Sequence, residues 1–496
     1  MNQMNRRHFV KTLGLGAGVL AAPSLLAASR AKAATAPAAS GAARPNIIYL
    51  ILDEWGYYEW SGMGHPILQT PNIDRFAADG MRFTQLLAGG HVCAPARCAL
   101  MTGQHTGHCP IRDNFPRIPL HPDDVTIAEV LKQAGYATGG FGKWGLGDRG
   151  TSGVPEKHGF DVFFGYYDQV HAHSYYPRYL IRNSEKVNLP GNTDDWKEGE
   201  TYSHYLIYRE SIRFIKENGE AKKPFFAYLC WTPPHGKHVI PATDPAWLRY
   251  KDLELPGKSD AKDKNAALAY GAMIEMVDRQ LGDILAMLKK TGIEDNTIIF
   301  LSGDNGGAFY FADAKNPDGV YRPNVNPKTE QRFRGSKDIG LYEGGIRVPF
   351  LVRWSGHIKG GTVSDHLGYF PDVLPTVAEF AGVAPPAGID GISIVPTLLG
   401  RGGQKQHEYL YWENADSVAV RIGHWKAIRP PKQSDYELYD LSKDIEELNN
   451  LADQHPDIIA KAKACAQEAH RSARPGIVFD PDATWEGERK KAKEAK

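Results

Sequence analysis

The sequence predicts an α/β protein with a large, mostly parallel central sheet flanked by helices and a smaller C-terminal α+β subdomain. Short apolar runs of strand length alternate with segments of helical periodicity, and this order is typical of a parallel sheet covered by helices. After about residue 402 the pattern changes to short strand-like pieces followed by one helix. At 496 residues the chain is long enough to bury a large core.

The first strand and helix illustrate the alternation. Residues 46–52, NIIYLIL, form a nearly continuous apolar run, as in a strand that is buried on both faces. Thr70 and Pro71 then open the segment NIDRFAAD, which closes at Gly80. A cap residue, a proline in the first turn and a closing glycine together predict a helix.

The remaining elements follow from the same patterns. In 266–290 the apolar residues recur at helical spacing, so core packing explains Met273 and Met276. A final run of charges, 486–496, is expected to be a solvated tail. We expect further helices at 126–133 and 456–470, and strands at 137–141, 225–231, 297–302, 350–354, 409–412, 418–422 and 436–441.

The N-terminus has the features of a twin-arginine signal peptide, which we place at residues 1–33. Residues 5–11 read NRRHFVK, an apolar stretch follows, and AKA at 31–33 fits a cleavage site. Glycines and a proline interrupt that stretch, which is short for a membrane span. We therefore expect export by the Tat machinery to the periplasm or beyond, and no stable membrane insertion of the mature protein. The domains expected after the signal peptide are a flexible leader (34–44), a catalytic domain (45–402) and the C-terminal subdomain with its charged tail (403–496).

Charge and cysteine content exclude two classes of protein. The first 33 residues hold five basic and no acidic residues, which leaves 53 basic against 58 acidic residues in the rest, and this argues against a nucleic-acid partner. Five cysteines are too few for a disulfide framework in a chain of this length. If Cys93 has a catalytic role, the other four cysteines can form at most two disulfides, and the sequence does not assign their pairing. Cys98 is expected to pack in the helix that follows Cys93.

Polar residues follow several of the predicted strands, at the edge of the sheet where α/β proteins bind ligands. They are Asp53, Glu54, Lys143, His235, Asp304 and Asn305. The four oxygen donors among them suit a hard divalent cation, Ca²⁺ or Mg²⁺, better than zinc.

An ordered series of motifs carries a family resemblance. Residues 93–97 read CAPAR and are followed by LMTG, and GKW, SGDNGG and RGSK occur later, the last running into EGGIRVP at 343–349. With this series the chain resembles the formylglycine-dependent sulfatases of the alkaline phosphatase superfamily over nearly the whole mature length. The resemblance implies an alkaline phosphatase-like fold and hydrolysis of sulfate monoesters.

The resemblance also implies that Cys93 is oxidised to formylglycine by a formylglycine-generating enzyme. One hydroxyl of the hydrated aldehyde would attack sulfur, and the other would then lose its proton so that sulfate is released. An unmodified thiol has no such exit. The metal, Ca²⁺ or Mg²⁺, would be held by the residues at positions Asp53, Glu54, Cys93, Asp304 and Asn305.

The same comparison implies roles for four cationic or titratable side chains. Arg97 would hold the formylglycine hydroxyl, and Lys143 and Lys337 would contact sulfate. Lys337 would also assist the departing oxygen. His235 would contact sulfate or act as general acid.

Three positions depart from the family pattern. Glu54 stands where a second aspartate is frequent, and Ala96 replaces the usual serine. The segment GKWGLG has Gly145 where a histidine is common, which removes a usual hydrogen bond to the formylglycine. One hypothesis is that His171 or His173 reaches this space; the alternative is that both are exposed loop histidines.

Further residues near the nucleophile allow two interpretations. Arg112, with His105 and His108, either lines the substrate pocket or serves in capping and packing.

The sequence from Gln169 to Leu180 resembles bacterial sulfatases that act on galactose or N-acetylgalactosamine sulfates, so a sulfated carbohydrate is the expected substrate. The alternatives are a phosphomonoester or phosphonate hydrolase of the same superfamily, and a non-catalytic protein that binds sulfated glycans with an unconverted cysteine.

Overall fold

The computed structural model describes residues 44–115, 117–193, 195–256, 261–414, 417–474 and 483–494. The predicted signal peptide and the leader up to residue 43 lie outside these residues. In the described part of the chain, no helix has both the length and the apolarity needed to cross a membrane.

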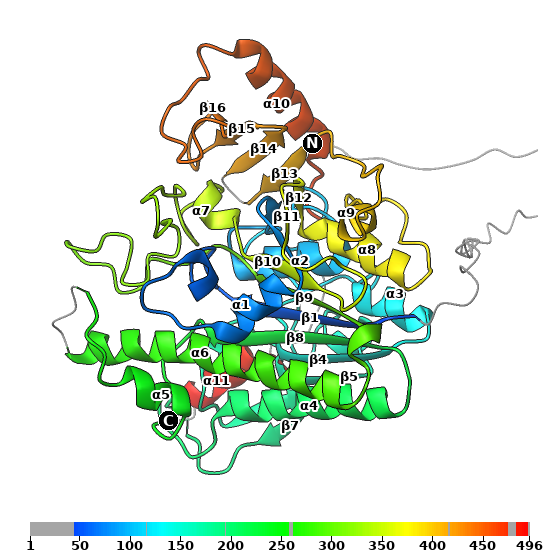
Figure 1. The fold of residues 1–496 in the computed structure, drawn as a ribbon, viewed down its shortest axis with the longest axis vertical. Coiled ribbons are helices and arrows are strands. Elements are labelled where there is room, and N and C mark those ends of the chain that lie inside the picture. Colours follow the sequence, from blue (N-terminus) through cyan, green and yellow to red (C-terminus); the bar gives the residue numbers. More distant parts are fainter. Residues whose placement is uncertain are drawn as a thin grey trace, which may run out of the picture. The chain divides into compact units, whose positions relative to one another are not determined.

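A ten-stranded mixed sheet forms the centre of the described part of residues 45–402, the predicted catalytic domain (Figure 1). Its strand order is β11-β2-β10-β9-β1-β8-β4-β5-β6-β7, and the five central strands from β9 to β5 run parallel to one another. The strands on both sides include antiparallel pairs. The bounds are β1 Asn46–Asp53, β2 Met81–Phe83, β4 Ala137–Lys143, β5 Val162–Tyr166, β6 Tyr179–Arg182, β7 Glu185–Asn188, β8 Phe225–Pro234, β9 Thr297–Gly303, β10 Phe350–Arg353 and β11 Thr362–Ser364. The predicted α/β fold with a mostly parallel centre is therefore confirmed.

Helices cover both faces of the sheet because alternate side chains of a strand point to opposite sides. Ile47, Tyr49 and Ile51 of β1 belong to the core that also contains α2, α3 and α8. The intervening residues of β1 belong to the core formed with α1, α4 and α6. The helices of the catalytic domain are α1 Pro71–Ala78, α2 Cys93–Thr102, α3 Ile127–Gln133, α4 Ser203–Glu220, α5 Pro245–Tyr250, α6 Ala261–Lys290, α7 Glu343–Ile346, α8 Val373–Phe380 and α9 Val395–Leu398.

Local signals explain where two of these helices begin. Thr126 and Glu129 form a reciprocal capping box at the start of α3, and Pro71 stands in the first turn of α1 after Thr70. The longest helix, α6, begins before the predicted residue 266 and ends at Lys290 as expected. A short pair of strands, β3 Leu86–Leu87 and β12 Gly368–Tyr369, lies beside the main sheet.

The C-terminal subdomain contains a four-stranded antiparallel sheet and a helix that packs on it. Its elements are β13 Leu410–Glu413, β14 Val418–Ile422, β15 Trp425–Arg429, β16 Glu437–Asp440 and α10 Pro456–Ala469. Sequence reasoning did not find β15. This strand forms a tight hairpin with β14 around Gly423, whose φ of +58° favours glycine.

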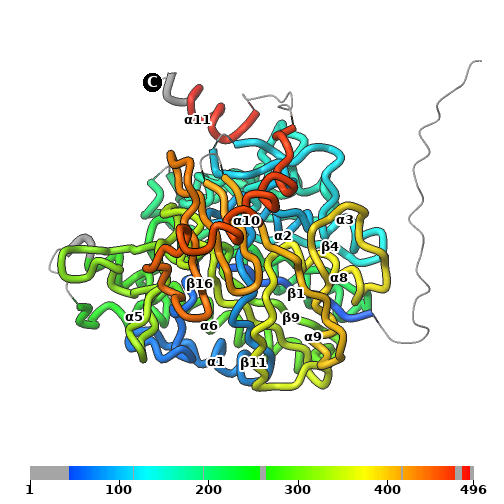
Figure 2. The backbone as a smooth tube through the Cα atoms, turned by 90° about the horizontal axis from the view of Figure 1, so that it is seen from above, coloured from blue at the N-terminus to red at the C-terminus, as the bar shows by residue number. Residues whose placement is uncertain are grey.

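The charged C-terminal run is helical and partly anchored, although Glu486 and residues 489–491 remain exposed as the sequence-based expectation of a solvated tail implies. Trp485–Glu494 forms α11, which is far from α10 in Figure 1 and lies at the edge of the molecule in Figure 2. Glu488 accepts hydrogen bonds from Arg149 and Lys186, each at 2.6 Å. The main-chain N–H of Trp485 donates to Asp148 at 2.7 Å. Because Glu488 and the main chain of Trp485 have specific partners on the catalytic domain, the start of this run is part of the fold.

Candidate active site

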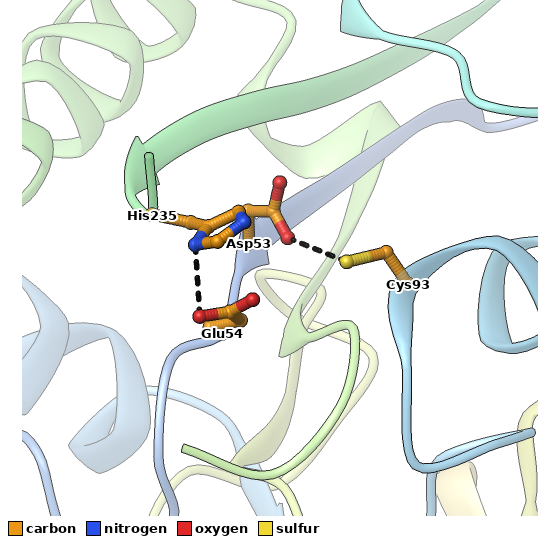
Figure 3. A group of neighbouring side chains, drawn as sticks. All are labelled: Asp53, Glu54, Cys93 and His235. Carbon is orange, nitrogen blue, oxygen red and sulfur yellow. Dashed lines mark hydrogen bonds and ion pairs between the residues drawn. The ribbon is translucent and has the colours of Figure 1, made fainter. Parts of the chain in front are cut away.

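The carboxyl ends of the parallel strands bring the predicted polar residues together. Asp53 ends β1 and Lys143 ends β4, while His235 directly follows β8. Cys93 is the first residue of α2. Figure 3 shows the Cys93 sulfur directed toward the Asp53 carboxylate and the His235 ring beside Glu54. One ligand atom from each of these four residues lies within 4.8 Å of the others.

The Cys93 thiol is buried and held in its protonated form. Its Sγ donates a hydrogen bond to Asp53 Oδ1 at 3.3 Å, and the residue is 1% exposed. Burial, and then the negative charge of Asp53, raise the pKa of Cys93 well above its usual value. An unmodified thiol in this position is therefore a poor nucleophile, because the thiolate is the reactive form.

Asp53 is surrounded by positive charge. Lys143 Nζ donates to Asp53 Oδ2 at 2.6 Å, and Arg97 Nη2 lies 3.7 Å from the same oxygen. Burial alone would raise the pKa of Asp53, but Lys143, His235 and Arg97 hold it well below its usual value. The carboxylate is thus ionised and ready to bind a cation.

Arg97 fixes a second carboxylate beside the first. Its Nε and Nη2 atoms lie 3.0 and 2.9 Å from Asp304 Oδ2, and its Nη1 donates to the carbonyl of Lys143 at 2.8 Å. The other oxygen of Asp304 accepts the main-chain N–H of Glu54 at 2.9 Å. Burial and the nearby Asp53 raise the pKa of Asp304 to about 7. Two carboxylates held this close need a cation between them to stay ionised together.

The donor set fits a hard divalent metal. Asp53, Glu54 and Asp304 supply carboxylate oxygens, and Asn305 supplies an amide oxygen. The Asn305 amide nitrogen donates to the carbonyl of Gly306 at 2.9 Å, whereas its oxygen is buried without a hydrogen-bond partner in the described residues. A buried, unpaired oxygen among carboxylates is the kind of group that Ca²⁺ or Mg²⁺ coordinates.

His235 connects the carboxylates to the surrounding loops. Its Nδ1 lies 2.8 Å from Glu54 and 2.6 Å from the Tyr310 hydroxyl, which also contacts Glu54. Its Nε2 lies 3.0 Å from His173 Nε2 and 3.4 Å from Lys337 Nζ. Burial lowers the pKa of His235 to about 4, so the ring is neutral at physiological pH. Lys337 also pairs with Glu54, and burial lowers its pKa.

Comparison with known proteins identifies the family. The profile described as "Sulfatase" matches residues 45–383, and the profile "N-sulphoglucosamine sulphohydrolase, C-terminal" matches residues 337–470. The chain is 31% identical to mouse (Mus musculus) N-acetylgalactosamine-6-sulfatase over 420 residues, which cover 78% of this chain and 73% of the relative. The chain belongs to the sulfatase family. It is therefore a sulfuric ester hydrolase, which agrees with the resemblance seen in the motifs.

Solved structures share the fold of this sulfatase. Ps i-CgsB, solved in complex with k-i-k-neocarrahexaose, superimposes with a TM-score of 0.70 and 24% identity over 87% of this chain and 94% of that chain. BT4656, solved with its substrate D-glucosamine-2-N,6-O-disulfate, gives a TM-score of 0.66 and 22% identity over 86% of this chain and 98% of that chain. At these identities the likeness establishes the fold alone.

Other predicted residues of the sulfatase have different surroundings. His171 is buried, and its ring stacks on Trp485 with centroids 5.5 Å apart. Arg112 pairs with Glu413 and donates to the carbonyls of Gly107 and Arg471. These contacts place His171 in the packing of α11 and Arg112 at the junction with the C-terminal subdomain.

The two histidines that follow α2, His105 and His108, contact Asp390 and do not join the Cys93 cluster. His108 Nδ1 lies 2.8 Å from Asp390, and His105 lies 3.6 Å from the same carboxylate. All five cysteines of the sulfatase lie in the described residues and are free thiols. Cys98 is buried in α2, as expected.

The space at Gly145 is filled by a residue that sequence reasoning did not select. A Cβ at Gly145 would lie 2.9 Å from the amide nitrogen of Gln169, so the glutamine side chain occupies this position rather than His171 or His173. The compensation hypothesis is therefore corrected: His173 contacts His235 instead. Tyr310 belonged to no motif, and Gln169 began a segment noted only for its resemblance to glycan sulfatases; the positions of both depend on loop folding that periodicity does not reveal.

Proposed function

We propose that this sulfatase hydrolyses sulfate monoesters of a sulfated carbohydrate of the galactose or N-acetylgalactosamine type, with a formylglycine made from Cys93 and a bound divalent metal. The observation that carries the proposal is the buried contact between Cys93 and Asp53, set among Lys143, Arg97 and the oxygen donors. The name of the mouse relative, N-acetylgalactosamine-6-sulfatase, supports a substrate of the N-acetylgalactosamine type.

The residues around Cys93 have distinct tasks in this proposal. Lys143 and Lys337 bind the sulfate oxygens and neutralise charge that grows as the ester bond breaks. Arg97 holds Asp304 and keeps positive charge next to residue 93. His235 is neutral and lies beside Lys337, so it is placed to contact sulfate or to pass a proton toward the departing oxygen.

The metal and the modified residue supply the chemistry that the standard side chains lack. Asp53, Glu54, Asp304 and Asn305 would hold the cation, Ca²⁺ in preference to Mg²⁺, together with the oxygen of residue 93. A bound divalent cation withdraws charge from sulfate oxygens, and formylglycine provides a hydroxyl nucleophile in place of the protonated thiol.

Mass spectrometry of the Cys93 peptide tests the modification. Protein produced together with a formylglycine-generating enzyme should carry the aldehyde or its hydrate at residue 93. Cys98 lies in the same helix and serves as an internal control, because it should remain an alkylatable thiol. A retained thiol at Cys93 in an active preparation would contradict the formylglycine mechanism.

Release assays test the reaction and its alternatives. Wild-type protein should release inorganic sulfate from sulfated galactose or N-acetylgalactosamine far faster than phosphate from the matching phosphates. Preferred phosphate release would favour a phosphoryl hydrolase. Tight binding of sulfated sugars with no release in the converted protein would favour a glycan-binding protein.

Chelation tests the metal. Removing divalent ions should abolish sulfate release and lower the melting temperature, and added Ca²⁺ should restore both more completely than Mg²⁺. Asn305→Ala should raise the Ca²⁺ concentration needed for half-maximal restoration, whereas Asn449→Ala, at an exposed position, should not. Full activity after exhaustive chelation would exclude a required metal.

The N-terminal motif supports export after folding. We expect recognition by the twin-arginine machinery and delivery to the periplasm or beyond. Replacing Arg6 and Arg7 by lysine should leave precursor in the cytoplasm with residues 1–33 attached. Unchanged export of that variant would point to another route.

A further inference from the structure

Gln169 presents a buried amide for which the protein supplies no partner. The residue is 8% exposed, and neither its amide oxygen nor its amide nitrogen has a hydrogen-bond partner in the described residues. A buried unpaired polar group costs about 1–3 kcal/mol. A buried amide that remains unpaired on both atoms is placed to bind a ligand.

A cavity opens directly beside this amide. It has a volume of about 410 Å³ and is bordered by Ala94, Gly145 and Gln169; we call it the Gln169 cavity. Ala94 follows the nucleophile position, and Gly145 lies two residues after Lys143. Its size falls in the range of small-molecule sites, roughly 300–1,000 Å³. The cavity therefore borders the chain segments that carry Cys93 and Lys143, although neither of these two side chains lines it.

The outer wall of the Gln169 cavity comes from α11. Glu486, Gly487 and Lys490 line it, and the helix is anchored through Glu488 to Arg149, Lys186 and the Tyr179 hydroxyl. Glu486 itself lies 2.7 Å from Arg117. The C-terminal residues, which look like a solvated tail in the sequence, thus form one wall of the Gln169 cavity.

The cavity carries excess negative charge. Four carboxylates and two cations line it, namely Asp113, Asp148, Asp168, Glu486, Arg117 and Lys490. Arg117 is already shared between Asp168, at 3.0 Å, and Glu486. Burial and the Asp168 carboxylate raise the pKa of Asp148 to about 7, as expected where negative charge accumulates.

These features select a type of ligand. Carboxylates and an amide bind the hydroxyl and acetamido groups of a sugar, and Ile111 and Ile118 offer apolar surface to the C–H faces of a ring. A second sulfate or a uronate carboxylate directed into the cavity would meet like charge. An uncharged ring therefore fits this space better than an anionic one.

We propose that the Gln169 cavity binds the sugar ring that carries the scissile sulfate, that the Gln169 amide hydrogen-bonds a ring substituent, and that the cavity disfavours rings with a second anionic group. The inference rests on the proposed sulfatase function of the Cys93 site. It assigns recognition of the sugar to Gln169 and α11, whereas recognition of sulfate belongs to the lysines.

Binding to Cys93→Ala protein tests the inference without turnover. By calorimetric titration, N-acetylgalactosamine 6-sulfate should bind roughly tenfold or more tightly than the same sugar with a second sulfate. Adding Gln169→Ala should weaken binding of the monosulfated sugar roughly fivefold or more. Gln133→Ala is the matched control, because Gln133 is exposed on α3.

A second variant guards against a folding defect in Gln169→Ala. Asp113→Asn removes one carboxylate from the wall and should narrow the difference in affinity between the two sugars. Equal affinity for both sugars, no detectable binding of either, or unchanged affinity in folded Gln169→Ala protein would overturn the inference.

Sulfate release by the wild-type protein separates this inference from the proposed function. If the wild-type protein releases sulfate but the Cys93→Ala protein binds both sugars equally, the sugar-binding role of the cavity is wrong and the sulfatase reaction stands. If the Cys93→Ala protein prefers the monosulfated sugar but protein with formylglycine at residue 93 releases no sulfate, the proposed reaction is wrong and the cavity remains a sugar-binding site.

Discussion

The ammonium group of Lys426 lies 2.9 Å from a carboxylate oxygen of Glu343, and both side chains are fully buried. Glu343 begins the EGGIRVP motif of the catalytic domain, whereas Lys426 comes from β15 of the C-terminal sheet. A second carboxylate, Glu447, lies 2.9 Å from the same ammonium. Part of the motif is therefore structural, because it joins the C-terminal sheet to the catalytic domain.

Lys426→Met should destabilise the protein strongly. The substitution leaves Glu343 and Glu447 buried close to each other without their shared cation, and removal of one partner from a buried ion pair costs about 3–5 kcal/mol. The melting temperature and the urea midpoint should both fall. Lys443→Met is the control, because Lys443 is 83% exposed in its contact with Asp440 and should matter by less than about 1 kcal/mol. Similar effects of the two substitutions would contradict a stabilising role for the buried pair.

Much of the central fold could be predicted because its signals are local, although the sequence patterns did not reveal β5 or α4. The run NIIYLIL is almost entirely apolar because β1 is buried on both faces. The capping box of Thr126 and Glu129 marks the start of α3. Strand β7 was not predicted, because its residues are largely exposed at the edge of the sheet and show no apolar pattern. The apolar part of β4 ends before Lys143, but pairing with β5 continues the strand through that residue.

Gly145→His should not create a better active site. Gly145 has a φ of +77°, and a Cβ there would contact the Gln169 amide, so the histidine would be strained and crowded. A left-handed conformation alone costs a non-glycine residue about 1–2 kcal/mol. The melting temperature and kcat/KM for sulfate release should therefore fall.

The double variant Gly145→His/Gln169→Ala provides the comparison. Removal of the glutamine side chain makes room for the imidazole, so the double variant should be more stable than Gly145→His alone. Independent, additive effects of the two substitutions would show that the two side chains do not compete for the same space.

His173→Ala should lower kcat for sulfate release more than it raises KM. His173 Nε2 lies 3.0 Å from His235 Nε2, so His173 orients the ring that faces Lys337 and Glu54. Loss of one orienting hydrogen bond corresponds to roughly a tenfold effect. His173→Gln, whose amide can replace the contact, should recover part of the rate. If His173→Ala turns over a good substrate at the wild-type rate, His173 has no positioning role.

The proximity of Asp53, Glu54, Cys93 and His235 could be predicted because these residues follow strands or carry a motif, and the geometry of a parallel sheet brings strand ends to one edge. The contacts of Gln169, Tyr310 and His173 could not, because each depends on the path of a loop. The sequence analysis proposed His171 or His173 for the space at Gly145, but the side chain of Gln169, in the same segment, fills it. The local sequence of α11 does not indicate which residues Glu488 contacts, because those partners lie more than 300 residues away in the chain.

Glu59→Gln should flatten the dependence of stability on pH. Glu59 is 1% exposed and accepts hydrogen bonds from the Tyr270 hydroxyl at 2.8 Å and from the N–H of Gly56 at 2.7 Å. Burial raises its pKa to about 8 against an ordinary value of 4.5. The folded state thus binds this proton more tightly than the unfolded state does. The contribution to stability is complete below pH 4.5 and is lost as the pH rises toward 8.

Each pKa unit corresponds to about 1.4 kcal/mol, so the protonated carboxyl stabilises the folded state by a few kcal/mol more at pH 5 than at pH 9. Glutamine has the same shape and stays neutral, so the melting temperature of Glu59→Gln should fall less than that of the wild type between these two pH values. Glu217→Gln, at an exposed position of α4, should follow the wild type. Parallel melting curves for Glu59→Gln and wild type would mean that Glu59 is ionised in the folded protein across the whole range, with Tyr270 and Gly56 stabilising its charge.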